Sequence, residues 1–265
     1  MMAIVAHPGD EAFGFGGAIA TAAATGAYVV VVCATRGVFD ARLLDKAPAP
    51  GGRNRSYAKP TVWRNLDTVR EDELRRSVAM LGVRVLRMLD YSETTLSDVN
   101  YDDLVARIVE PIRMHRPEVI LSFGPDGLTG DPDHIALHRV VRDAFARAAE
   151  PLSYEDDIEE DQVAWRAAKL YELVAAGGEM DMPGIPLAAE GATVTLDLGE
   201  VAPLKLAAIN RHVTQTGTGG AFSDWSAEDR ERYLGTESYR LARSNLPVPA
   251  GSSDATESSL FDGLP

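Results

Sequence analysis

The alternation of short apolar runs with amphipathic segments over residues 1–150 constrains the fold of this chain most strongly. The segment AYVVVVCAT at positions 27–35 is apolar and β-branched, as in a parallel strand covered on both faces. MMAIVA, VRVLRML and EVILSF have the same character, and segments with helical spacing separate them. This pattern predicts an α/β fold, a Rossmann-like doubly wound and mainly parallel sheet flanked by helices on both faces.

The chain also divides into regions of different composition. We expect one domain over residues 1–246 and a disordered tail over 247–265, which is rich in Pro, Ser, Gly and Asp. Residues 38–65 lack periodicity, which predicts a long loop. Arginine and aromatic side chains in this loop make it a candidate substrate lid, with a plain surface loop as the alternative. They include Arg42, Arg53, Arg55 and Trp63.

Three helical segments carry specific expectations. TVREDELRRSVAMLG at 68–82 predicts a helix that opens with a capping box of Thr68 and Glu71. YDDLVARIVEPIRMH at 101–115 predicts a helix interrupted near Pro111. VAPLKLAAINRHVTQ at 201–215 predicts one helix. One face of this helix, which by default is exposed to solvent, carries Lys205, Ala208, His212 and Gln215. Later strands are expected over 169–176 and 192–199.

The composition limits which classes of partner this protein can bind. A net charge of −14 argues against nucleic acid and anionic membranes, since both attract basic surfaces. The one cysteine, Cys33, cannot form an internal disulfide, and no apolar run reaches the roughly 20 residues of a membrane span. The N-terminus lacks the basic start of a signal peptide. We therefore expect a cytoplasmic protein without a membrane span, and a homo-oligomer is compatible with this sequence.

Histidine and acidic residues cluster after two of the predicted strands. His7, Asp10 and Glu11 follow the first strand, and Asp131, Asp133 and His134 follow the fourth. Doubly wound sheets bind ligands beyond the carboxyl ends of strands, where the strand order reverses. If the first and fourth strands are neighbours, His7, Asp10 and His134 converge. Two imidazoles and a carboxylate with one position left for water form a catalytic zinc arrangement.

Simpler interpretations remain open for these residues. His7 can be a satisfied polar group, Asp10 a helix N-cap, and Asp131 and Asp133 turn or cap residues. Arg70 is by default a surface residue. The glycines of GFGG at 14–17 lack the spacing of a dinucleotide-binding loop, and the neighbouring carboxylates would repel a pyrophosphate.

Four motifs in order resemble the PIG-L/LmbE family of zinc-dependent N-acetylglucosamine deacetylases. The family patterns are A-H-P-D-D-E with a following Gly-Gly, R-x-x-E-L with L-G-V, G-x-T-G-H-P-D-H, and K-x-x-A with H-x-x-Q. This chain has AHPGDE and GFGG, REDEL and LGV, GLTGDPDH, and KLAAINRHVTQ.

The resemblance implies roles for individual residues. It implies one Zn²⁺ per chain, held by His7, Asp10 and His134, with Asp133 tuning the site from behind the ligands. It also implies a small-molecule N-acetyl amino-sugar conjugate as substrate. Contacts to that substrate are expected from three further side chains, which are Arg70, Arg36 and His212.

Two positions depart from the family pattern. Gly9 stands where the family has its general base, and Asp131 stands where it has the histidine that stabilises the oxyanion. Three accounts follow: a deacetylase in which Asp131 or Glu11 replaces the base, a zinc protein with another hydrolytic activity, or a ligand-binding pseudoenzyme. An accidental change at position 9 alone would not explain Asp131.

Overall fold

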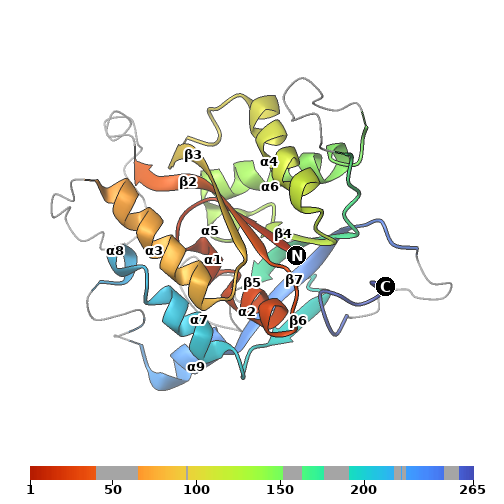
Figure 1. Ribbon diagram of the computed structural model, residues 1–265. Helices are drawn as coiled ribbons and strands as arrows, with labels where there is room; N and C mark the ends of the chain where they lie inside the picture. The colour runs from red at the N-terminus through yellow and green to blue at the C-terminus, as the bar shows by residue number, and fades with distance from the viewer. Residues whose placement is uncertain are drawn as a thin grey trace.

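The computed structural model describes residues 1–39, 65–93, 95–151, 163–175, 191–217, 222, 225–247 and 257–265. The predicted lid falls almost entirely outside these residues. Seven strands form one sheet in the order β3-β2-β1-β4-β5-β7-β6 (Figure 1). Their bounds are β1 Met2–Val5, β2 Val30–Phe39, β3 Val85–Glu93, β4 Val119–Phe123, β5 Lys169–Ala175, β6 Val194–Asp197 and β7 Thr236–Ser244.

The predicted fold class is confirmed by the pairing of the strands. β3, β2, β1, β4 and β5 are parallel neighbours, while β7 runs antiparallel to both β5 and β6. β1 pairs with β2 on one side and with β4 on the other, so that Met2 lies opposite both Val30 and Ile120. The strand order therefore reverses at β1 and β4, and the residues that follow these two strands meet at one edge of the sheet.

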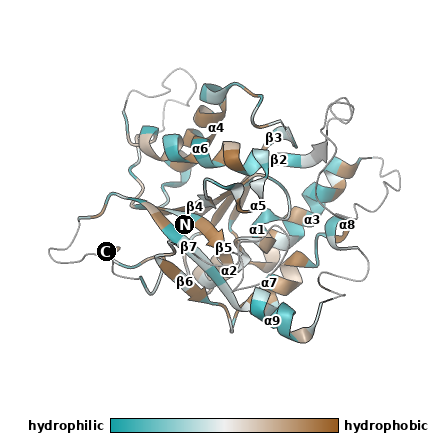
Figure 2. Ribbon diagram, turned by 180° about the vertical axis from the view of Figure 1, so that it is seen from behind, coloured by the Kyte–Doolittle hydropathy of each residue, from teal (hydrophilic) through white to brown (hydrophobic). Residues whose placement is uncertain are grey.

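Helices cover both faces of the sheet. α4 packs with α6, whereas α2 and α3 pack with α7 across the sheet from them (Figure 1). In Figure 2 α4 and α6 each show teal and brown residues, as expected for helices with one face on the sheet. The bounds are α1 Asp10–Phe13, α2 Gly16–Ala24, α3 Leu66–Met80, α4 Tyr101–His115, α5 Gly127–Gly130, α6 Pro132–Arg147, α7 Ala202–Ile209, α8 Val213–Thr216 and α9 Ala227–Gly235.

The last two glycines of GFGG, Gly16 and Gly17, open α2, and a carboxylate of the chain itself binds at this helix N-terminus. Glu237 on β7 accepts hydrogen bonds from the backbone N–H groups of Gly17 and Ala18, at 2.7 and 2.8 Å. A Cβ on Gly17 would collide with Leu198 and approach Glu237, so glycine is required by close packing. The N-terminus of α2 is thus closed by protein rather than open to a phosphate.

Three expectations about the helices are corrected. α3 begins after Asn65, so Thr68 is not its N-cap. α4 runs through Pro111 without a break, because its apolar face is buried against the core and outweighs one missing backbone hydrogen bond. The segment predicted as one helix over 201–215 divides at Asn210 into α7 and α8.

The C-terminal end also differs from the expectation of a disordered tail. Glu257 bridges to Val194 and pairs with Lys169 at 2.6 Å, and Leu260 is buried. Residues 257–265 therefore pack on the sheet, while 248–256 lie outside the described residues. Among the described helices none has the length and apolar character that crossing a membrane requires.

Candidate active site

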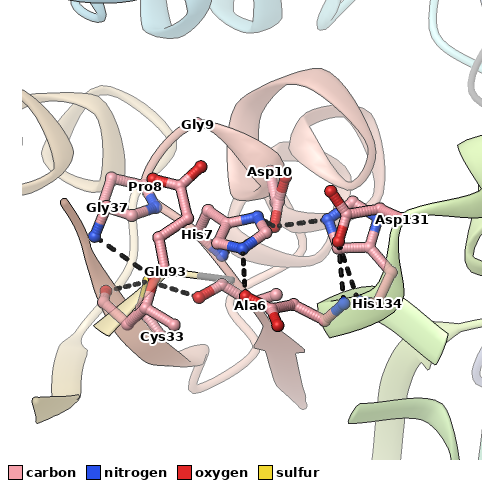
Figure 3. A network of polar contacts seen from close by, with 12 residues as sticks. Ala6, His7, Pro8, Gly9, Asp10, Cys33, Gly37, Glu93, Asp131 and His134 are labelled. Atoms are coloured by element: carbon pink, nitrogen blue, oxygen red, sulfur yellow. Dashed lines mark hydrogen bonds and ion pairs between the residues drawn. The ribbon is translucent and has the colours of Figure 1, made fainter. Parts of the chain in front are cut away.

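Side chains from the ends of β1 and β4 meet as the neighbouring strands require. His7 follows β1, Asp10 begins α1, and Asp131 and His134 lie at the start of α6. Figure 3 shows His7, Asp10, Asp131 and His134 lying close together at this edge of the sheet. The predicted convergence of the first and fourth strand ends is therefore present in the structure.

His7 is held from behind by a carboxylate. Its Nε2 lies 3.0 Å from Oδ2 of Asp133, whose other oxygen accepts a hydrogen bond from the backbone N–H of Leu96. Asp133 is almost fully buried, so this contact fixes both the ring orientation and the proton on Nε2. The other ring nitrogen of His7, Nδ1, faces Asp10, with 3.6 Å between Nδ1 and Oδ2.

His134 is held in the same manner by a different group. Its Nδ1 lies 3.0 Å from the carbonyl oxygen of Gly127, and its ring stacks on Phe123 with centroids 3.8 Å apart. The remaining nitrogen, Nε2, is buried and has no hydrogen-bond partner of good geometry among the described residues. It lies 3.2 Å from Oδ2 of Asp10. A buried nitrogen in this state fits a metal ligand, because metal-binding histidines usually donate their other N–H to a carbonyl or carboxylate.

Asp10 concentrates negative charge between the two imidazoles. Oδ2 also accepts a hydrogen bond from the backbone N–H of His7 at 2.7 Å. Burial raises the pKa of Asp10, but the two histidines outweigh burial and hold it well below its usual range. Burial lowers the pKa of His7, yet the carboxylates of Asp133 and Asp10 raise it to about 9. The cluster thus favours positive charge at its centre, which a divalent cation supplies.

Asp131 faces the same pair of histidines. One of its carboxylate oxygens lies within 4.8 Å of a ring nitrogen of both His7 and His134, a spacing compatible with a shared metal ion. Oδ1 also caps α6 by accepting hydrogen bonds from the backbone N–H groups of Asp133 and His134, at 2.9 and 3.3 Å. Asp131 is half-buried, so it is reachable from solvent as well as from the cluster.

Glu11 points to a different set of partners. Its carboxylate accepts hydrogen bonds from Gly9 N at 2.7 Å and Ser77 Oγ at 2.5 Å, and lies 2.6 Å from Nε2 of His212. Both Glu11 and His212 are fully buried. Burial lowers the pKa of His212, but the charge of Glu11 raises it above its ordinary value. Glu11 therefore ties α1 to α3 and α8, and any substrate contact of His212 would be indirect.

The two arginines predicted at the substrate occupy different places. Arg70 is buried, donates to the carbonyl oxygens of Pro8 and Gly37, and pairs with Glu93 at 2.8 Å. Gly37 has φ +72, and a Cβ there would collide with the guanidinium. Arg70 thus braces the backbone beside His7.

Arg36 lies apart from the histidine cluster. It pairs with Glu71 at 3.0 Å and Asp90 at 2.8 Å. These residues line a cavity of about 320 Å³ whose lining contains none of the candidate metal ligands. The structure therefore does not bring Arg36 together with His7, Asp10 and His134.

Two residues that shape the site are not predicted by the sequence. Phe123 supports the ring of His134, and Glu93 neutralises Arg70. Phe123 reads as an ordinary last residue of a buried strand, and Glu93 as an ordinary polar residue of an edge strand. Neither carries a spacing signal, because both act through contacts between distant segments.

Comparison with known proteins bears directly on this cluster. A model of the PIG-L family, described as GlcNAc-PI de-N-acetylase, matches residues 2–145. Two relatives are named 1D-myo-inositol 2-acetamido-2-deoxy-alpha-D-glucopyranoside deacetylase. The one from Streptomyces griseus is 30% identical, covering 100% of this chain and 89% of the relative. The one from Geodermatophilus obscurus is 29% identical, covering 100% of this chain and 98% of the relative.

Solved structures share the fold at lower identity. N,N'-diacetylchitobiose deacetylase from Pyrococcus horikoshii has a TM-score of 0.65 and 17% identity, with 91% of this chain and 82% of that chain covered. The 4-carboxy-2-hydroxymuconate hydratase from Pseudomonas putida has a TM-score of 0.63 and 17% identity, with 94% and 98% covered. These two proteins carry different named activities, so they establish the fold alone. The family match and the full-length similarity of the relatives together show that this chain belongs to the PIG-L family.

Proposed function

We propose that this protein is a zinc-dependent amide hydrolase that removes the acetyl group from an N-acetylglucosaminyl conjugate. The observation that carries the proposal is a pair of buried imidazoles. In each ring one nitrogen contacts a protein oxygen, and the other nitrogen, Nδ1 of His7 or Nε2 of His134, faces Asp10. The names of the relatives support the substrate class, since both describe the deacetylation of an inositol-linked 2-acetamido sugar.

The ligands of the metal would be His7 Nδ1, His134 Nε2 and the carboxylate of Asp10. Two nitrogens and one carboxylate oxygen suit zinc with a position left open for catalysis. When bound, zinc supplies Lewis-acid chemistry, polarising the acetamide carbonyl and lowering the pKa of a water molecule. Asp133 keeps His7 in the required tautomer through the contact at Nε2.

Asp131 is the residue we propose as general base. It faces the histidine pair, it is half-buried, and both of its capping hydrogen bonds use Oδ1. Its other oxygen can therefore take a proton from the attacking water and return it to the nitrogen as the C–N bond breaks. One water is consumed, and acetate and a free amine are formed. Glu11 is the weaker candidate, because three partners already hold its buried carboxylate.

The test combines metal analysis with an assay of amine release. Protein purified without chelator is analysed for metal and incubated with an inositol-linked N-acetylglucosamine and with N-acetylglucosamine itself. We expect zinc in the protein and amine release that a chelator removes and added zinc restores. Asp131→Asn should lower kcat by about 10²–10⁴-fold, the range for losing a general base. Zinc-loaded protein that releases amine from neither compound would contradict the proposal.

A second candidate function is ligand binding without catalysis. The observation that favours it is Gly9, which offers no side chain at the position between the candidate ligands His7 and Asp10. In that case zinc is present and the sugar conjugate binds in calorimetry, but amine is not released. Turnover that depends on Asp131 would exclude this candidate.

A further inference from the structure

A side chain from another segment lies against the backbone of Gly9, at the position where a Cβ would stand. Gly9 has φ +111, a conformation that L side chains rarely adopt. A Cβ added there would collide with Oε1 of Gln215, and it would lie 3.0 Å from both Cδ and Nε2 of the same side chain. The carboxamide of Gln215 therefore fills the space in which a side chain at position 9 would begin.

Gln215 is fixed in this place by its own contacts. Nε2 donates to the carbonyl oxygen of Pro8 at 3.0 Å, and the backbone N–H donates to the carbonyl oxygen of His212. Its neighbour Thr214 donates to Glu73 through both N and Oγ1, at 2.8 and 2.5 Å. These contacts fasten α8 to α3 and to the turn that carries the candidate ligands.

Gln215 lies at the surface, where a ligand can approach it. Gln215 is exposed, whereas His212 at the start of the same short helix is fully buried. With Nε2 engaged by Pro8, Oε1 is the atom that lies against Gly9 and has acceptor capacity left. A neutral amide oxygen accepts a hydrogen bond but does not take up a proton near neutral pH.

We propose that Gln215 supplies the polar group that Gly9 lacks. Its Oε1 accepts a hydrogen bond from the water that attacks the substrate. Gln215 then orients this water, while the proton passes to Asp131. This part rests on the proposed function. The structural part, that residues 9 and 215 share one space, does not depend on it.

The structural part is tested by a cycle of Gly9→Ala, Gln215→Ala and the double variant, measured by thermal unfolding. Gly9→Ala alone meets both backbone strain and the clash, whereas in the double variant only the strain remains. We expect the fall in Tm caused by Gly9→Ala to be smaller by about 1–2 °C when residue 215 is alanine. Additive falls in Tm would overturn the shared space.

The functional part is tested by the kinetics of Gln215→Ala. We expect kcat for amine release to fall about 10-fold with KM nearly unchanged, as when a group acts mainly in the transition state. Val213→Ala is the matched control, since it truncates a side chain of α8 that is 44% exposed. Unchanged kcat in Gln215→Ala, or an equal loss in the Val213 control, would overturn the positioning role. If the wild type releases no amine, the proposed function fails, while the cycle in Tm still decides the shared space.

Discussion

Two buried charged clusters of this protein differ in whether their polar atoms are satisfied. Glu237 receives the N–H groups of Gly17 and Ala18, the ammonium of Lys205 at 2.9 Å and the hydroxyl of Tyr239 at 2.7 Å. The Asp10 cluster instead holds a buried nitrogen, His134 Nε2, that lacks a hydrogen bond of good geometry within the described residues. A complete set of partners is typical of a structural cluster, whereas the unpaired nitrogen beside Asp10 is a position at which a ligand can bind.

The largest effect is expected in the satisfied cluster. Lys205→Met removes the cation from a pair whose side chains are both fully buried. An uncompensated Glu237 should lower the free energy of unfolding by about 3–5 kcal/mol, as measured by urea denaturation. Metal content should stay at the wild-type level. Loss of less than ~1 kcal/mol would show that the two clusters do not differ as described.

The opposite result is expected for the unsatisfied cluster. His134→Asn keeps a donor near the Gly127 carbonyl but removes Nε2. Zinc affinity should fall by more than the roughly 10–100-fold that is typical for losing an outer partner. The metal-free variant should lose less free energy of unfolding than Lys205→Met loses, because the change removes packing but leaves no uncompensated buried lysine partner. Zinc affinity equal to that of the wild type in a competition titration would remove His134 from the ligand set.

Asp133→Asn changes only the residue that supports the candidate ligand His7. The amide can still meet Nε2 of His7, but it carries no charge and can present its N–H₂ instead of an oxygen. We expect zinc affinity to fall about 10–100-fold, measured by the same competition titration. An affinity within twofold of the wild type would mean that the contact at His7 does not tune the site.

The smallest effect on stability and zinc affinity is expected at Ser77, which donates to Glu11. Ser77→Ala removes one of three partners of Glu11 and leaves Gly9 N and His212 in place. We expect a loss of about 1.5 kcal/mol in unfolding free energy, the lower end for hydrogen bonds to charged groups. Zinc affinity should change little. A strong loss of zinc with unchanged stability would place Glu11 in the metal site instead.

The sequence predicted the fold and the meeting of His7, Asp10 and His134 for a physical reason. Strand periodicity locates the strands, and ligands in such sheets bind beyond the carboxyl ends of the strands. Because β1 and β4 are neighbours, the residues that follow these two strands meet. The same reasoning failed for Lys205 and His212, which it left on a solvated helix face and which are fully buried.

That failure comes from long-range pairing. Lys205 is buried because Glu237 on β7 lies beside it, and nothing local in the polar strand TESYRLARS announces this contact. Gln215 reaches Gly9 only because the segment leaves the helix at Asn210 and turns back. Contacts between segments that are distant in the sequence are set by tertiary packing, which periodicity does not encode.

A zinc titration of the metal-free wild type is the sharpest test of whether His7, Asp10 and His134 form a zinc site. Calorimetry should show one tight site per chain, and X-ray absorption at the zinc edge should show a first shell of two imidazole nitrogens with carboxylate oxygen at about 2.0–2.2 Å. His134→Asn should lose one of the two nitrogens. Absence of zinc binding by the wild type, or an identical first shell in the variant, would rule out this zinc site.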